Sequence, residues 1–299
     1  MIYRLAHTTT YLYGGTVSLS HHLLRLRPRD LERQRCLHNE LLIEPRPDVL
    51  CSHDDYFGNA MSFATIEGSH RRLVIASQSQ VSVVAPTFPA PHNTPSWESV
   101  RDMSPNGNQE EFLETREFVY QSPLIKKQPE FTDYASDSFP AGRPVLEAVV
   151  DLTERMHTDF KFDKLATNVA TPLMEVFATR RGVCQDFAQL QIGFLRAMGI
   201  AARYVSGYLE TEPPPGKPRL EGADASHAWV SFHCPGAGWI DVDPTNNLLV
   251  GQRHITLAWG RDYSDVSPIR GIIVGSGEHT LEVAVDVIPT TEDSALPKF

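Results

Sequence analysis

The stretch that decides the fold is Gly182-Val183-Cys184-Gln185-Asp186-Phe187, which opens an apolar segment ending at Gly199. The apolar positions of this segment recur at helical spacing: Phe187, Leu190, Phe194, Leu195 and Met198. They predict a buried helix that begins near Cys184 and stops at the glycine. Free backbone N–H groups and the dipole at a helix amino terminus favour an anion, so this position favours the thiolate of Cys184, which is the nucleophilic form.

Position alone does not separate a reactive thiol from a structural one. The four cysteines, Cys36, Cys51, Cys184 and Cys234, have no Cys-x-x-Cys spacing, and we expect thiols rather than disulfides in a reducing compartment. A lone cysteine is commonly a small buried core residue. The assignment of Cys184 therefore depends on its partners.

A predicted β-hairpin farther along the chain supplies a histidine. Its strands cover residues 226–233 and 239–243, and the turn covers residues 234–238. Because strand side chains alternate, His227 shares one face with Trp229 and can point into a site from a rigid strand. A lone strand histidine is usually just a hydrogen-bonded, partly buried residue, so His227 also needs partners.

Two aspartates on the second strand could orient His227, and the register of the hairpin separates them. If His233 and Trp239 flank the turn as a pair, Asp243 lies diagonal to His227, at roughly 7 Å or less between Cβ atoms. Asp241 then lies roughly 13 Å away along the ladder. Geometry favours Asp243 as the orienting acid and leaves Asp241 as a more distant or solvated group.

Cys184, His227 and Asp243 together form the general pattern of activated nucleophilic catalysis. The imidazole draws the proton from the thiol, and the carboxylate holds the imidazole. We expect the resulting ion pair to persist at neutral pH. The backbone N–H of Cys184 is the natural first donor of an oxyanion hole, and the second donor has to come from elsewhere.

Four segments surround this set of residues. Residues 1–85 show short alternating runs and predict an antiparallel, β-sandwich-like domain, and residues 86–143 form a connecting region with helical pieces, one of them near 110–120. Residues 144–250 predict an α+β catalytic core of helices on an antiparallel sheet. Residues 251–299 add strands that pack on the core or on the amino-terminal domain.

Within the core, residues 145–156 predict one helix. A second helix has Thr171 as its N-cap and Pro172 in its first turn, and it ends near residues 181–182. Residues 200–209 predict a strand, and residues 210–225, rich in proline, glycine and acidic side chains, predict an exposed loop.

The composition limits the classes of function. The chain has 299 residues, 41% of them hydrophobic and 21% charged, which is typical of a soluble globular protein. The net charge of -10 repels phosphate backbones and anionic lipid surfaces, so we expect no nucleic acid and no membrane as partners. No segment has the length of a signal peptide or a bilayer span, and we expect a cytoplasmic protein.

The motif blocks resemble the core of the transglutaminase-like superfamily. Three blocks occur in the family's order: Gly182-Val183-Cys184, His227-Ala228-Trp229, and Trp239 with Asp243-Pro244-Thr245. The stretch from Ala202 to Tyr208 resembles the family's strand after the nucleophile helix. Residues 7–13, 24–29 and 55–59 resemble the β domain that precedes this core in bacterial relatives.

This resemblance implies a papain-like superfamily fold with Cys184, His227 and Asp243 as nucleophile, base and orienting acid. It also implies a cysteine protease or amidase, as members of the bacterial group are regarded. The chain has no counterpart of the calcium-binding insertions of animal transglutaminases, and it lacks the papain-type Cys-Gly-Ser-Cys-Trp segment. We therefore expect neither calcium control nor a papain-like enzyme in the narrow sense.

We expect no cofactor and no metal. The clusters that could suggest a metal lack zinc spacing: Cys51 with His53, Asp54 and Asp55, His21 with His22, and His233 with Cys234. Cys184, His227 and an aspartate could also be imagined as zinc ligands, which metal analysis of the purified protein would decide.

Three functions follow, in decreasing order of support. The first is hydrolysis of an amide or isopeptide bond in a peptide-like substrate, through a thioester acyl-enzyme at Cys184. The second is acyl transfer to an amine by the same triad. The third is a non-catalytic scaffold that retains the fold and binds through its amino-terminal β module.

Overall fold

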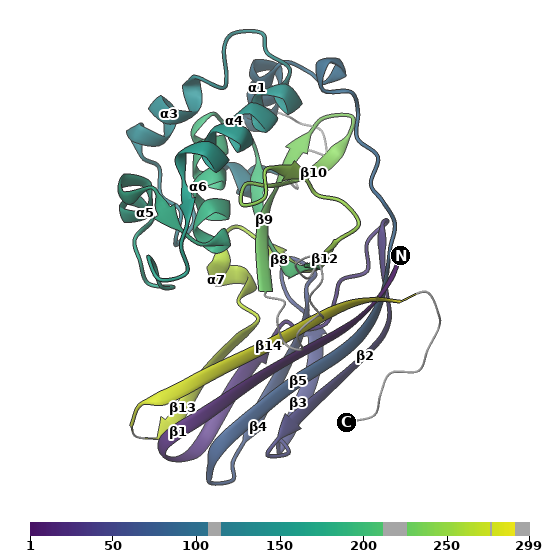
Figure 1. Cartoon of the computed structure of the whole chain (residues 1–299), viewed down its shortest axis with the longest axis vertical. Coiled ribbons are helices and arrows are strands. Elements are labelled where there is room, and N and C mark those ends of the chain that lie inside the picture. Colours follow the sequence, from purple (N-terminus) through teal and green to yellow (C-terminus); the bar gives the residue numbers. More distant parts are fainter. Residues whose placement is uncertain (107–114, 212–225, 276, 291–299) are drawn as a thin grey trace, which may run out of the picture.

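The amino-terminal residues form the antiparallel β region that their alternating pattern predicts. The computed structural model describes residues 1–106, 115–211, 226–275 and 277–290. The first five strands are β1 (Ile2–Leu24), β2 (Gln34–Glu44), β3 (Val49–Asp54), β4 (Ala60–Ile66) and β5 (His70–Val83). They lie in one sheet in the order β2-β5-β1-β4-β3 (Figure 1).

Strand β1 organises this sheet because both of its edges are paired. Its first half, Ile2 to Leu12, pairs with β5, and its second half pairs with β4. The register shifts between Leu12 and Val17, around Gly14. A Cβ at Gly14 would lie 3.0 Å from the carbonyl oxygen of Glu278, so the absence of a side chain permits this close approach.

The last strands return to this same sheet. Strands β13 (Ile269–Gly275) and β14 (His279–Thr290) both pair antiparallel with β1, and the register of β14 runs from Ile2 opposite Thr290 to Tyr13 opposite His279. Figure 1 shows β14 lying along β1. Strand β12 (His254–Gly260) belongs to the second sheet instead. Residues 251–290 thus contribute strands to both sheets.

The second part of the molecule combines helices with a five-stranded antiparallel sheet, ordered β11-β10-β9-β8-β12. Its strands are β8 (Ala202–Leu209), β9 (Ser226–Cys234), β10 (Gly238–Asp243), β11 (Leu248–Leu249) and β12. Its helices are α1 (Trp97–Asn106), α3 (Pro129–Ser136), α4 (Val145–Asp159), α5 (Leu173–Thr179), α6 (Cys184–Ala197) and α7 (Tyr263–Val266), with short 3-10 turns η1 (Pro91–Asn93) and η2 (Arg116–Val119). This arrangement confirms the predicted α+β fold class.

Helix α6 is the centre of the core. Every residue from Asp186 to Arg196 is buried, and the helix packs against β8 and β9. On its other side, Phe194 lies against the rings of Phe131, Tyr134 and Phe177, with centroids 4.7 to 5.9 Å apart. Truncating a buried phenylalanine such as Phe194 to alanine costs about 3–5 kcal/mol, so this cluster fixes the helix firmly.

Some local predictions differ from the structure. Helix α5 begins at Leu173 with Pro172 in the N-cap position, so the predicted cap, Thr171, is wrong. The Thr171 hydroxyl instead accepts a hydrogen bond from the backbone N–H of Asn168. Of the helix predicted near 110–120, residues 110–114 lie outside the described residues, and the described remainder forms only η2. Most of the predicted loop, residues 212–225, also lies outside them.

Within the described ranges, no helix combines the length and the apolar character needed to cross a bilayer. All four cysteines are free thiols.

Candidate active site

The amino terminus of α6 holds Cys184 in a fixed position. Just before it, β7 (Arg181–Gly182) pairs with β6 (Lys161–Phe162), which anchors the incoming chain. The Asp186 carboxylate then accepts a hydrogen bond of 2.9 Å from the backbone N–H of Val183, the N-cap residue, and one of 2.6 Å from the Thr167 hydroxyl. This carboxylate satisfies one of the free N–H groups at the helix start.

The same carboxylate explains the glycine two residues before the cysteine. A Cβ at Gly182 would lie 2.7 Å from Oδ2 of Asp186, closer than side-chain carbons approach such atoms. The Gly-x-Cys spacing is therefore needed to bring the chain past Asp186 into the helix. Burial raises the pKa of Asp186, against the hydrogen bonds from Thr167 and Val183, which lower it.

Strand β9 presents His227 beside a buried indole. His227 lies opposite Gly207 of β8 in the register, and the Trp229 ring packs over that glycine, where a Cβ would lie 2.5 Å from it. Trp229 is fully buried, and its ring centroid lies 6.1 Å from that of His227 and 5.2 Å from that of His254. The indole therefore forms a rigid wall beside both imidazoles.

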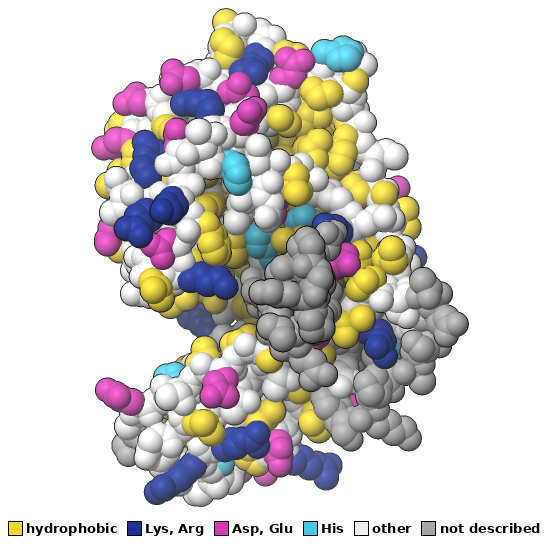
Figure 2. Space-filling model, viewed as in Figure 1, with side chains coloured by type: hydrophobic (Ala, Val, Ile, Leu, Met, Phe, Trp, Pro, Cys, Tyr) yellow, Lys and Arg dark blue, Asp and Glu magenta, His cyan; other side chains and the backbone are white. Residues whose placement is uncertain are grey.

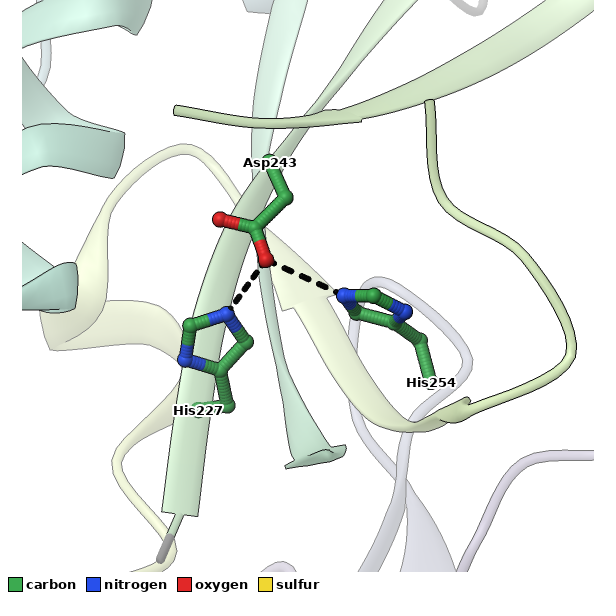
Figure 3. Close-up of side chains that lie close together, drawn as sticks. All are labelled: His227, Asp243 and His254. Atoms are coloured by element: carbon green, nitrogen blue, oxygen red, sulfur yellow. Dashed lines mark hydrogen bonds and ion pairs between the residues drawn. The ribbon is translucent and has the colours of Figure 1, made fainter. Parts of the chain in front are cut away.

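Asp243, at the end of β10, is the hub of the site (Figure 3). Its Oδ2 lies 2.7 Å from Nε2 of His227 and 3.1 Å from Nε2 of His254, and it accepts a hydrogen bond of 2.7 Å from the side-chain amide of Asn246. Its Oδ1 accepts from the backbone N–H groups of Thr245 and Asn246. Because an ionised carboxylate only accepts, both imidazoles donate from Nε2.

These contacts set the charges of the site. Burial alone would raise the pKa of Asp243, but the hydrogen bonds from His227 and His254 and the charge of His227 lower it well below its ordinary value. Burial lowers the pKa of His227, yet the interactions with Asp243 and with the neighbouring Cys184 outweigh it and raise the pKa to about 10. Asp243 is therefore an anion at neutral pH, and His227 is a cation.

His254 has the opposite state, although it touches the same carboxylate. Burial lowers its pKa, and the charge of His227 lowers it further, against the attraction of Asp243. His254 is therefore neutral at pH 7 and acts as a hydrogen-bond donor to Asp243. One cationic and one neutral imidazole thus share a single carboxylate oxygen.

Cys184 and His227 line one pocket of about 220 Å³. Since Nε2 of His227 is bonded to Asp243, its other ring nitrogen, Nδ1, is the atom left for a thiol. Tyr204 of β8 lines the same pocket and is almost fully buried. The structure thus brings the three predicted residues together and adds a tyrosine beside them.

Three residues of this site were not identified from the sequence. Asn246 follows the Asp-Pro-Thr block directly, so its proximity to Asp243 could have been noticed. Tyr204 lies in the stretch that resembles the family's strand after the nucleophile helix, but nothing in that stretch singles it out. His254 carries no local signal, because it reaches the site from another strand and the chain has 12 histidines.

The hairpin register agrees with the prediction. His233 lies opposite Trp239, and Ser231 lies opposite Asp241. Asp241 is not a solvated group, however: its Oδ2 accepts from the indole of Trp229 at 3.2 Å and from Arg33 at 3.1 Å. Asp241 therefore supports the indole wall, and Asp243 alone of the two touches His227.

One group in the described part of the chain could hold a metal ion, and its composition differs from the zinc set considered from the sequence. The ligand atoms of His227, Asp243 and His254 lie within 4.8 Å of one another, whereas Cys184 is not part of the group. In the observed arrangement the two imidazoles donate to the carboxylate oxygen that a metal would use.

Comparisons with known proteins agree with this geometry. Residues 133–244 match the transglutaminase-like superfamily, and residues 3–82 match the bacterial transglutaminase-like N-terminal region. The chain therefore belongs to the transglutaminase-like superfamily, in the bacterial group that carries this amino-terminal region.

Particular relatives extend the match over the whole chain. Uncharacterized proteins of Mycobacterium tuberculosis and Mycobacterium bovis are 42% identical over 98% of this chain and 94% of their own length. A putative cysteine protease from Cytophaga hutchinsonii has the same fold, with a TM-score of 0.75, 18% identity and coverage of 100% of this chain and 94% of that one. A protein-glutamine gamma-glutamyltransferase of Pseudomonas aeruginosa is 44% identical over 71 residues, 23% of this chain and 11% of that protein.

Proposed function

We propose that this protein is a cysteine-dependent hydrolase, a protease or amidase, that cleaves an amide or isopeptide bond in a peptide-like substrate. One observation carries the proposal. Cys184, at the amino terminus of α6, lines the same pocket as His227, and the buried carboxylate of Asp243 holds that imidazole at 2.7 Å. Thiol, imidazole and carboxylate are the three groups that activated thiol catalysis requires.

The chemistry begins with a thiolate at Cys184 and an imidazolium at His227. The sulfur attacks the carbonyl carbon and forms a C–S bond, and the negative charge moves to the carbonyl oxygen. The backbone N–H of Cys184 and the Tyr204 hydroxyl are the donors that we assign to this oxyanion. When the C–N bond breaks, His227 gives its proton to the leaving amine, and a thioester remains.

Hydrolysis then restores the enzyme. His227, now neutral, takes a proton from water, and the resulting hydroxide attacks the thioester carbon. The C–S bond breaks, the acid leaves, and the thiolate and imidazolium are regenerated. Asp243 stays ionised throughout and stabilises the imidazolium each time that it forms.

The second candidate is acyl transfer to an amine, which the similarity to the gamma-glutamyltransferase of Pseudomonas aeruginosa favours. It uses the same thioester and differs only in whether water or an amine attacks it. A donor peptide is therefore incubated with and without a primary amine, and the products are weighed. If the amine is found joined to the acyl group, in a product of correspondingly higher mass than the free acid, the reaction is acyl transfer rather than hydrolysis.

The proposal is tested first by the reactivity of the thiols. Cys51 is exposed and Cys184 is partly buried, so if solvent access alone set the labelling rate, Cys51 would react faster. We expect iodoacetamide to modify Cys184 faster in the native protein, because the thiolate is the reacting form. Labelling of Cys184 no faster than Cys51 would contradict the proposal and favour a non-catalytic scaffold. If Cys184 is labelled slowly, metal analysis of the same sample tests whether bound zinc protects its thiol.

A further inference from the structure

The pocket at Cys184 is built from both parts of the molecule. The catalytic core contributes the thiol and the imidazole on one side. The amino-terminal sheet contributes the opposite wall, from two strands that lie far apart in the sequence. The wall residues are Thr9 and Tyr11 of β1 and Leu281 and Val283 of β14. Figure 2 shows the surface indented between the body that carries the helices and this sheet.

The wall is the solvent-exposed part of a largely apolar face of strands β1 and β14. Thr9 lies opposite Val283, and two residues along the strands, Tyr11 lies opposite Leu281, so the four side chains share one face of the sheet. Val285, two residues after Val283 on β14, points to the same face and is only 1% exposed, because the catalytic core covers it. Val283 is 51% exposed and Leu281 is 53% exposed.

This face of β1 and β14 is therefore covered by the catalytic core at Val285, and it is exposed to solvent farther along, at Val283 and Leu281, where it lines the pocket. Pockets that bind small groups are lined mainly by apolar and aromatic side chains of this kind. Because Cys184 lies in the same pocket, a substrate whose carbonyl reacts with the thiol would place the adjoining part of its chain against these exposed residues.

The described part of the wall carries no acidic or basic side chain. Among the described residues that line the pocket, none is Asp, Glu, Lys or Arg. His7, at the inner end of the wall, hydrogen-bonds the Tyr208 hydroxyl through Nδ1 at 2.7 Å and the Thr9 hydroxyl through Nε2 at 2.9 Å. Burial lowers the pKa of His7 to about 4, so this imidazole is neutral at pH 7. A charged side chain placed against this wall would lose water without gaining a charged partner from the wall.

We propose that strands β1 and β14 form the specificity wall of the active site, and that this wall selects substrates with an apolar aromatic or branched aliphatic side chain on the acyl side of the cleaved bond. The inference rests on the proposed function, since it assumes that Cys184 forms the acyl-enzyme. It gives the amino-terminal sheet a direct part in substrate recognition.

The test uses N-acetyl aminoacyl chloromethyl ketones with Phe, Glu or Lys side chains. The thiolate displaces chloride and forms a C–S bond to the methylene carbon, which places the side chain in the pocket. The rate of labelling at Cys184 is measured by mass spectrometry and divided by the rate with iodoacetamide, which has no side chain. We expect the Phe reagent to exceed the Glu and Lys reagents by roughly 10- to 100-fold, the gain from burying such a side chain.

A charge on the wall should change this preference. In Val283→Lys, with each rate divided by the iodoacetamide rate of the same variant, we expect the Phe reagent to lose roughly 10-fold and the Glu reagent to gain. The matched control is Thr280→Lys, which adds the same charge at an exposed position of β14 whose side chain faces the other side of the sheet. This control should behave like the unchanged protein.

The outcomes separate the two proposals. Equal normalised rates for the three reagents, or the same behaviour in Val283→Lys and Thr280→Lys, would overturn the specificity wall while the fast iodoacetamide reaction of Cys184 still supported the enzyme. A slow iodoacetamide reaction at Cys184 would overturn the enzyme and the specificity wall together.

Discussion

Replacing Asp243 by asparagine tests the charge balance of the site most directly. The carboxylate is fully buried, and with its charge it holds the pKa of His227 at about 10. At pH 8 an imidazole with that pKa is about 99% protonated, whereas one at the ordinary value of 6.5 is about 3% protonated. Without the carboxylate, burial pushes the pKa of His227 down rather than up.

We therefore expect Asp243→Asn to lower the population of the thiolate and imidazolium pair at pH 8 by up to about 30-fold, because Cys184 remains to raise the pKa of His227 in part. The assay is the rate of iodoacetamide labelling at Cys184, with Cys51 as the internal standard in the same sample. Because an ordinary thiol with a pKa of about 8.5 is still about one-quarter ionised at pH 8, the rate at Cys184 should fall by about fourfold, and the rate at Cys51 should not change.

The matched control is Asp241→Asn on the same strand. Its carboxylate binds the Trp229 indole and Arg33 rather than His227, so the labelling rate should stay within about 1.5-fold of the unchanged protein. Circular dichroism and thermal melting establish that both variants are folded. A folded Asp243→Asn protein with an unchanged rate ratio would refute the reasoning that the carboxylate maintains the ion pair.

Three further outcomes follow from the geometry. Tyr204→Phe should slow acyl-enzyme formation from a peptide about 100-fold, yet leave iodoacetamide labelling of Cys184 unchanged, since alkylation forms no oxyanion. Because the pKa of His227 is raised from 6.5 to about 10 in the folded protein, its contribution to stability is full below about pH 6.5 and is lost as the pH rises through 10, so Tm should fall over that range. Gly207→Ala should lower the free energy of unfolding by about 1–3 kcal/mol or more because its Cβ would lie 2.1 Å from the backbone oxygen of Ile255 and 2.5 Å from the Trp229 ring, whereas Gly251→Ala, with open space around it, should not.

The sequence predicted the local parts of the site well, for a physical reason. The α6 helix and the β9-β10 hairpin are continuous in the chain, and a short turn over residues 235–237 sets the pairing of His233 with Trp239 and so the place of Asp243. The sequence predicted a turn of five residues, and the structure pairs its two ends, Cys234 and Gly238. The contact between His227 and Asp243 follows from this register alone.

The parts that the sequence did not predict depend on contacts between distant segments. Alternation identifies β13 and β14 as strands but does not say which sheet they join, because pairing with β1 leaves no local trace. The same limit applies to His254, which reaches Asp243 from β12. The cap of α5 was missed for a different reason, since Thr171 and Pro172 each favour the first positions of a helix and only the folded chain decides between them.

The pairing of the first strand with the last has a consequence for synthesis in the cell. Ile2 leaves the ribosome long before its partner on β14, Thr290, is made. Contacts this distant in the chain form late, and domains fold as the chain emerges from its amino terminus. The helical body can therefore form while one wall of its pocket is still missing. In this order the pocket beside Cys184 would lack its β14 side until that strand has been made.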